Sequence, residues 1–172
     1  MKRVMIVGAP GSGKSTLARK LGELTGLPVY HMDQIHYQPG WVERNRAEKT
    51  RMTQEVHAKE RWIFEGGHSA TYQERFDRAD TLIWLDLPVG LRFFRVFWRT
   101  IKQYGKSRPD LPEGCPERFN WETLDFWRFI WRTRQTSRLK ILNLLQDVLV
   151  EKNILHFTQQ HEVDSYIRLK TR

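Results

Sequence analysis

The sequence predicts an α/β fold in which a parallel sheet is covered by helices on both faces. Three observations carry this prediction. Short apolar runs alternate with amphipathic helical patterns along most of the chain, as in sheets built from crossover connections. The first apolar run leads directly into G-A-P-G-S-G-K-S-T at 8–16, a pattern that binds phosphate between a strand and a helix. The 172 residues suit one domain, so we expect residues 1–172 to fold as a single unit.

Apolar runs predict five strands, at 4–7, 28–32, 62–64, 81–85 and 154–157. Helical patterns fall between and after them, at 14–24, 43–60, 72–76, 89–104, 121–149 (with a break near Thr136) and 161–169. A Pro/Gly-rich loop occupies 105–120. Because parallel strands end at one edge of a sheet, and ligands bind at that edge, the residues after the strands are candidate site residues: Gly8, Asp33, Glu65 and Asp86.

The stretch 8–16 matches the P-loop pattern G-x-x-x-x-G-K-[ST] in its required setting of strand, loop and helix. Its glycines let backbone N–H groups point at a phosphate, and the helix adds its positive end. Lys14 is expected to reach the β- and γ-phosphates, and the Ser15 hydroxyl to ligate Mg²⁺. We expect ATP to be held by the whole stretch: Gly8, Ala9, Pro10, Gly11, Ser12, Gly13, Lys14, Ser15 and Thr16.

Other motifs narrow the class of P-loop protein. A switch GTPase needs a base-reading N-K-x-D, which the sequence lacks. A motor or AAA-type ATPase usually has an acidic pair after the hydrophobic strand, whereas Asp86 is followed here by Leu87 and Pro88. The sequence therefore favours a small ATP- and Mg²⁺-dependent phosphotransferase.

The basic charge is concentrated in the second half of the chain. Formal net charge is +9, and residues 92–140 contain twelve Lys or Arg against five acids. Phosphoryl transfer needs positive charge around the moving group, so we interpret 92–140 as a helical lid. We expect Arg95, Arg99 and Arg108 to act in catalysis and Arg132 to bind the nucleotide. The alternative is a solvated basic face.

Three strand-end or loop features point to an acceptor site. Asp33 is expected to hold the acceptor hydroxyl, to act as its base, or to support Mg²⁺ through water. Glu65, Gly66 and Gly67 combine a carboxylate with a backbone that a substrate can approach closely. Trp41 could stack on a planar acceptor. The alternatives are a capping aspartate, an ordinary turn, and a tryptophan that covers a core edge.

Aromatic residues alternate with arginines along the expected lid, as they do on surfaces that bind single-stranded nucleic acid. The alternative is that two helices pack together through their aromatic faces. The aromatic residues are Phe93, Phe94, Phe97, Trp98, Trp121, Phe126, Trp127, Phe129 and Trp131. Nucleic acid therefore stays open as a partner.

Five stretches resemble one family: G-A-P-G-S-G-K-S-T-L-A, H-M-D-Q-I-H-Y-Q-P-G-W, R-W-I-F-E-G, A-D-T-L-I-W-L-D-L-P and S-R-P-D-L-P-E-G-C-P-E-R-F. They are similar to the bacterial DNA topology modulation proteins, a branch related to adenylate-kinase-like small-molecule kinases. The resemblance implies a three-layer, nucleoside-monophosphate-kinase-like P-loop NTPase fold with a five-stranded parallel sheet and ATP at 8–16. Its name implies an effect on DNA topology. One departure is Glu65, where the family pattern has Asp.

We therefore expect a kinase that transfers the γ-phosphate of ATP to a small acceptor. The alternative is a nucleic-acid-binding regulator that uses ATP as a conformational ligand. The single cysteine and the lack of an apolar run of roughly 18 residues favour a cytoplasmic location without membrane contact.

Overall fold

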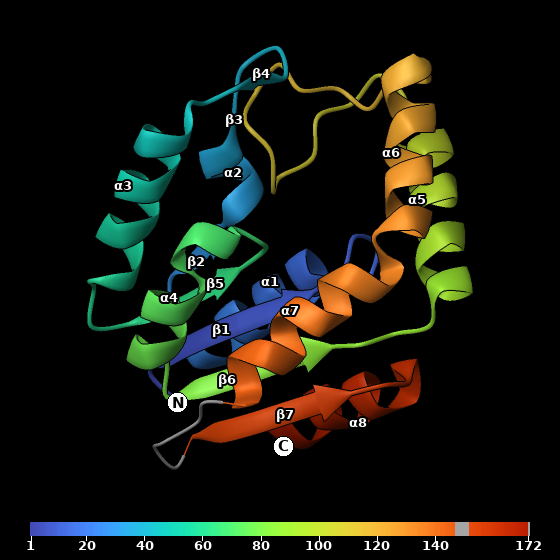
Figure 1. Cartoon of the computed structure of the whole chain (residues 1–172). Coiled ribbons are helices and arrows are strands. Elements are labelled where there is room, and N and C mark those ends of the chain that lie inside the picture. Colours follow the sequence, from blue (N-terminus) through green and yellow to red (C-terminus); the bar gives the residue numbers. More distant parts are fainter. Residues whose placement is uncertain (147–151, 172) are drawn as a thin grey trace.

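The computed structural model describes residues 1–146 and 152–171. Its main sheet has five parallel strands in the order β2-β5-β1-β6-β7 (Figure 1). The strands are β1 (Arg3–Gly8), β2 (Val29–His31), β5 (Trp62–Glu65), β6 (Thr81–Leu85) and β7 (Asn153–Phe157). The predicted five-stranded parallel sheet is confirmed. The order places β1, and with it the P-loop, at the centre of the sheet.

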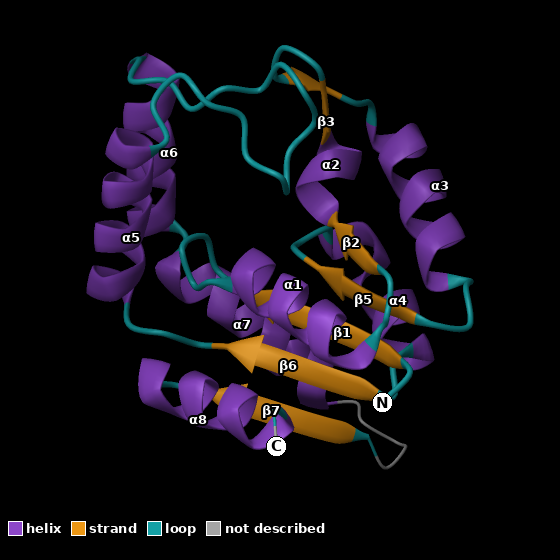
Figure 2. Cartoon of the chain, turned by 180° about the vertical axis from the view of Figure 1, so that it is seen from behind, coloured by secondary structure: helices purple, strands orange, loops and turns teal. Residues whose placement is uncertain are grey.

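Helices cover both faces of the sheet, which Figures 1 and 2 view from opposite sides. One face packs against α1 (Lys14–Thr25) and α8 (Gln160–Lys170), through side chains such as Leu21 and Val163. The other packs against α3 (Arg46–His57), α4 (Tyr72–Arg78) and α7 (Arg134–Gln146), through side chains such as Phe76. Strands buried on both faces must be apolar throughout, and residues 4–7 of β1 are all fully buried.

Residues 92–140, which we call the lid region, contain most of α5 (Val89–Lys102), α6 (Trp121–Arg132) and the start of α7. α5 and α6 pack through Trp127, whose ring lies 5.4–5.8 Å from those of Phe93, Phe97 and Phe119. The long helix expected at 121–149 is divided at Thr133, three residues before the expected break. The Thr133 hydroxyl donates to the Phe129 carbonyl at 2.7 Å, which closes the last turn of α6. Residues 147–149 of that prediction lie outside the described residues.

Several short elements were not predicted. α2 (Met32–His36) takes the last residue of the second expected strand, and η1 (Ser69–Thr71) precedes α4. β3 (Tyr37–Gln38) and β4 (Val42–Glu43) form a small antiparallel hairpin. The polar helix expected from residue 43 begins only at Arg46, because the Asn45 side chain accepts the Glu48 amide at 2.9 Å and caps it there. In the described parts of the chain, no helix is both long and apolar enough to cross a membrane.

Candidate active site

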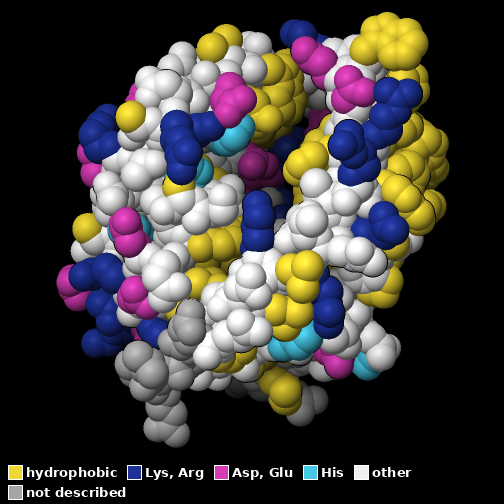
Figure 3. Space-filling view, in the orientation of Figure 1, with side chains coloured by type: hydrophobic (Ala, Val, Ile, Leu, Met, Phe, Trp, Pro, Cys, Tyr) yellow, Lys and Arg dark blue, Asp and Glu magenta, His cyan; other side chains and the backbone are white. Residues whose placement is uncertain are grey.

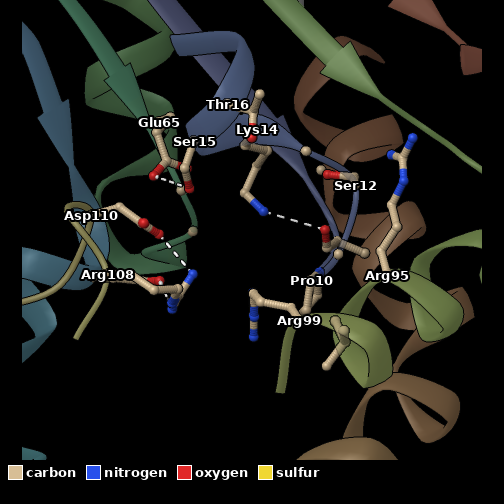
Figure 4. Close-up of a pocket in the computed structure, with 18 of the residues that line it drawn as sticks. Pro10, Ser12, Lys14, Ser15, Thr16, Glu65, Arg95, Arg99, Arg108 and Asp110 are labelled. Carbon is tan, nitrogen blue, oxygen red and sulfur yellow. Dashed lines mark hydrogen bonds and ion pairs between the residues drawn. The ribbon is translucent and has the colours of Figure 1, made fainter. Parts of the chain in front are cut away.

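The P-loop lies between the end of β1 and the start of α1. Gly13 precedes the helix with a φ of 92°, and no side chain in the described parts of the chain caps that end. The first amides of α1 are therefore available to an anion. Lys14 Nζ donates to the Ala9 carbonyl at 3.2 Å, so the ammonium lies across the loop (Figure 4). The Ser12 hydroxyl is buried and has no hydrogen-bond partner among the described residues, so it too is available to an oxyanion.

A cavity of about 1310 Å³ opens above the P-loop, and the space-filling view shows this face hollowed, with basic and acidic side chains in the hollow (Figure 3). All nine residues of 8–16 line it. It is also lined by the other expected site residues except Asp86 and Arg132: Asp33, Trp41, Glu65, Gly66, Gly67, Arg95, Arg99 and Arg108. The structure therefore brings the expected phosphate and acceptor residues into one cavity, large enough for a nucleotide and a second small molecule.

Glu65 lies beside the expected metal ligand rather than out in the acceptor space. Its Oε1 accepts the Ser15 hydroxyl at 3.0 Å (Figure 4). The same oxygen lies 2.8 Å from His31 Nδ1. The parallel register of β2 and β5 pairs His31 with Glu65, which explains the contact. A hydroxyl and a buried carboxylate at this distance are oxygen donors that suit Mg²⁺ bound directly or through water. The sequence reasoning missed His31 because only strand pairing reveals its position.

Asp33 lies in α2, just past the end of β2, and faces the cavity. Its side chain keeps 49% of its surface accessible through the cavity, and Arg108 Nη2 lies 4.0 Å away. Desolvation within the fold and the charge of Glu65 raise the pKa of Asp33, while Lys14 and Arg108 act against that rise. A raised pKa makes this carboxylate a better proton acceptor than an exposed aspartate.

The arginines of the expected lid fall into two groups. Arg95 and Arg99 extend from α5 toward the cavity (Figure 4), and Arg95 Nη2 donates to Gln160 of α8 at 2.7 Å. Arg108 lies in the loop opposite them and donates to Asp110 at 2.8 Å. Arg132 does not line this cavity: it lies on the outer side of α6, in a shallow groove with aromatic residues. Helical rotation explains this, since Phe126 and Phe129 present the cavity side of α6.

Two other arginines of that stretch have structural partners. Arg92 is buried, and its Nε donates to the Leu87 carbonyl at 2.9 Å, away from the phosphate site. Arg138 pairs with Asp86 at 2.8 Å and so connects α7 to the end of β6. The basic residues of 92–140 therefore do not all face the cavity: Arg95 and Arg99 line it, whereas Arg92 and Arg138 do not.

A buried arginine, Arg75, hydrogen-bonds to the turn after β5, and the sequence analysis did not identify it. Arg75 is fully buried, and its Nη2 donates to the Gly66 carbonyl at 2.9 Å. Its guanidinium lies 4.7 Å from the centre of the Phe64 ring and 5.3 Å from that of Tyr72. Burial lowers the pKa of Arg75 to about 10. Its hydrogen bond fixes the backbone that follows Glu65.

The loop after α5 is fastened to the β3–β4 hairpin. Trp41 Nε1 donates to the Pro116 carbonyl at 3.0 Å, and the Trp41 amide donates to Cys115 Sγ at 3.4 Å. Gly40 N donates to the Gly114 carbonyl at 3.1 Å. The Pro/Gly-rich loop expected at 105–120 is therefore attached to the hairpin, which its sequence did not indicate. This attachment also places Trp41 in the cavity wall, which local sequence could not show because the partners are more than 70 positions away.

Comparisons with known proteins agree with this fold. Residues 4–103 match a family model described as an AAA domain. From the residues after Asp86, the sequence analysis excluded an AAA-type ATPase. At the level of the protein family, that exclusion is wrong. No curated protein matches the chain in sequence.

Solved structures with a similar fold include three kinases. Shikimate kinase from Acinetobacter baumannii, in complex with shikimate, has a TM-score of 0.60 at 17% identity, covering 98% of this chain and 90% of that chain. Deoxyadenosine kinase from M. mycoides with bound dATP has a TM-score of 0.56 at 13% identity, covering 99% and 97%. A sugar kinase from Janibacter sp. has a TM-score of 0.55 at 13% identity, covering 98% and 91%. At these identities the likeness shows the fold.

Proposed function

The chain belongs to the AAA domain family and has a P-loop kinase fold, and we propose that it is an ATP- and Mg²⁺-dependent kinase of a small acceptor. One observation carries the proposal. Lys14, the Ser15–Glu65 pair and Asp33 line the same cavity, so phosphate, metal and acceptor groups converge on one place. Binding ATP as a regulatory ligand alone would not require Asp33, a second carboxylate, in the same cavity as the P-loop.

In this proposal the P-loop amides and Lys14 bind the β- and γ-phosphates, and Ser15 with Glu65 holds Mg²⁺, which when bound neutralises phosphate charge. Arg95 and Gln160 extend the nucleotide side of the cavity toward α8. Asp33 orients the acceptor hydroxyl and takes its proton. Arg99 and Arg108 lie opposite the P-loop and stabilise the charge that develops on the transferred group.

The test measures acceptor-dependent ADP formation. The pure protein is incubated with ATP, Mg²⁺ and a panel of nucleosides, nucleoside monophosphates, sugars and small hydroxy acids. We expect one acceptor class to stimulate ADP release. Lys14→Ala should lower the rate of this acceptor-dependent release at least a hundredfold. Lys106→Ala, a lysine outside the cavity lining, is the matched control and should keep wild-type turnover. ATP binding without any acceptor-dependent ADP would contradict the proposal.

The second candidate is the DNA-related function implied by the family resemblance, and one observation favours it. On the outer side of α5, Phe94 and Trp98 stack at 6.3 Å, and Lys102 Nζ lies 5.6 Å from the Trp98 ring. Phe94 is 61% exposed. Exposed aromatic rings beside cations suit single-stranded nucleic acid. Fluorescence anisotropy with a labelled oligonucleotide over a salt series tests it: Trp98→Ala should weaken binding without changing ADP formation.

A further inference from the structure

The charged side chains that line the cavity disfavour the binding of a second phosphate group. Eight Lys and Arg line it against six acids: Asp33, Glu65, Asp110, Glu117, Glu122 and Asp164. Mg²⁺-bound ATP carries roughly two negative charges, which balances that excess of cations. An acceptor that brought a phosphate of its own would therefore add charge without a matching cation. Buried charges are stable only where they are paired.

The arginines that face the acceptor space already have carboxylate partners. Glu117 Oε1 lies 3.0 Å from Arg99 Nε and 3.0 Å from Arg108 Nε, and the Glu117 side chain is only 9% exposed. Arg108 also donates to Asp110 at 2.8 Å, and the Asp110 side chain is 5% exposed. A phosphate-bearing acceptor needs free, forked guanidinium donors. To gain them from Arg108 it would have to displace two buried carboxylates, whereas the Glu117 contact of Arg99 engages only the Nε atom of that guanidinium.

Arg118, the remaining arginine on the acceptor side of the cavity, does not make a second phosphate more favourable. Arg118 is exposed, and the acid Glu122, which also lines the cavity, is exposed as well. A single solvated guanidinium is worth much less to a phosphate than a desolvated pair.

Aromatic rings form the other part of the acceptor space. Trp41 and Tyr37 line it from the hairpin, with ring centres 5.1 Å apart and planes at 77°. Phe126 and Phe129 line it from α6, with ring centres 6.3 Å apart and nearly parallel planes. In Figure 1 the hairpin and α6 lie on opposite sides of the loop that joins α5 to α6. A flat ring that packs against either of these aromatic pairs is favourable for stacking.

The backbone of Trp41, one of these aromatic residues, has a strained conformation. Among the described residues it is the one non-glycine residue with a positive φ, at 65°. A bulky residue in that region is strained, and such strain is found most often at sites of function. The hydrogen bonds of its indole and amide to Pro116 and Cys115 hold it there.

From these contacts we infer that the acceptor is an uncharged hydroxyl compound with a flat ring, of the nucleoside class, rather than a nucleoside monophosphate. The inference rests on the proposed kinase function. The acceptor hydroxyl oxygen forms a bond to the γ-phosphorus of ATP, and the bond from that phosphorus to the β–γ bridging oxygen breaks. ADP leaves with the electron pair, and the hydroxyl proton passes to Asp33.

The first experiment compares matched acceptors that differ only in a phosphate. Label from [γ-³²P]ATP is followed onto the common ribo- and deoxyribonucleosides, onto their 5′-monophosphates, and onto the sugars and small hydroxy acids of the panel above. We expect kcat/KM for at least one nucleoside to exceed that of its monophosphate by a hundredfold or more. Preferred transfer to monophosphates, or transfer only to acceptors without a flat ring, would overturn the inference and leave the kinase proposal standing. Absence of transfer to every acceptor would overturn both.

The second experiment removes the carboxylate partner of Arg99 and Arg108. Glu117→Gln removes the carboxylate that Arg99 and Arg108 share, and Glu113→Gln, an exposed acid of the same loop outside the cavity lining, is its matched control. We expect Glu117→Gln to tighten 5′-monophosphate binding about tenfold by calorimetry, with no gain for nucleosides and no change in the control. Asp110→Asn should act in the same direction if Glu117→Gln does not fold. Unchanged monophosphate affinity in a folded variant would refute the role of these pairs.

Discussion

The contact between the P-loop and the lid region can be tested with a single added methyl group. Gly11 has a φ of +78°, and a Cβ at this position would collide with the Arg92 carbonyl oxygen and lie 2.9 Å from Val96 Cγ2. Arg92 and Val96 both belong to α5, so Gly11→Ala pushes the P-loop away from the first turns of that helix. Gly26 provides the control: its φ is +65°, and no described atom lies within 4 Å of its added Cβ.

The two variants share every energy term except the collision. Each places an alanine in the left-handed region, at roughly 1–2 kcal/mol. Each also restricts the unfolded chain by a similar amount, which offsets part of that loss. Overpacking a tight contact adds about 1–3 kcal/mol. We therefore expect Gly11→Ala to lower the free energy of unfolding by about 1–3 kcal/mol more than Gly26→Ala does.

Urea unfolding, followed by tryptophan fluorescence and by circular dichroism, measures the difference. Unchanged m-values would show that the comparison concerns the folded state. Calorimetry with ATP supplies a second readout, because Gly11→Ala should weaken nucleotide binding whereas Gly26→Ala, at the far end of α1, should not. Equal stability and equal ATP affinity of the two variants would refute the close contact between Gly11 and α5.

Three further predictions concern other parts of the chain. Partial burial acts to raise the pKa of Asp80, but hydrogen bonds from two backbone amides and from Thr81 prevail and lower it below its ordinary 3.8. Asp80→Asn should therefore cost about 1 kcal/mol at pH 7, allowing for solvent screening, and the difference from wild type should vanish as the pH falls below 3.8, measured by urea unfolding. Lys152→Met removes three hydrogen bonds of 2.8–2.9 Å to carbonyls at the end of α4 and should lower Tm by several degrees in calorimetry. Glu65→Gln should raise the Mg²⁺ concentration for half-maximal ADP formation at least tenfold, and an unchanged Mg²⁺ titration would mean that Glu65 does not support the metal.

Local signals explain why the sheet and the P-loop were predictable. The strands β1, β5 and β6 are buried on both faces and so appear as uninterrupted apolar runs. The P-loop is a contiguous motif whose setting can be checked within twenty residues. Because parallel strands end together, Asp33 and Glu65 could be assigned to the same edge without knowledge of the strand order.

The rest of the site depends on contacts between distant segments. β3 and β4 are two residues each, which is too short for any periodic pattern. In the sequence, Glu117 and Asp110 are acidic residues of a loop, and only the folded structure shows their ion pairs with Arg99 and Arg108. The direction of each lid arginine also depends on which face of α5 or α6 meets the cavity. That is why the sequence could not show that Arg95 and Arg99 line the cavity whereas Arg132 does not.

The contacts of the lid region restrict how it can close. At one end, the start of α5 packs its backbone against Gly11 and anchors Arg92 on the Leu87 carbonyl. In the middle, the loop is hydrogen-bonded to the β3–β4 hairpin through Trp41. Closure of residues 92–140 as one rigid body would break both attachments. α6 lies between that fastened loop and the helix junction at Thr133, and its Trp127 packs against Phe93 and Phe97 of α5. Closure over an acceptor is therefore limited to small shifts of α6 that keep this packing and leave Arg99 and Arg108 in place.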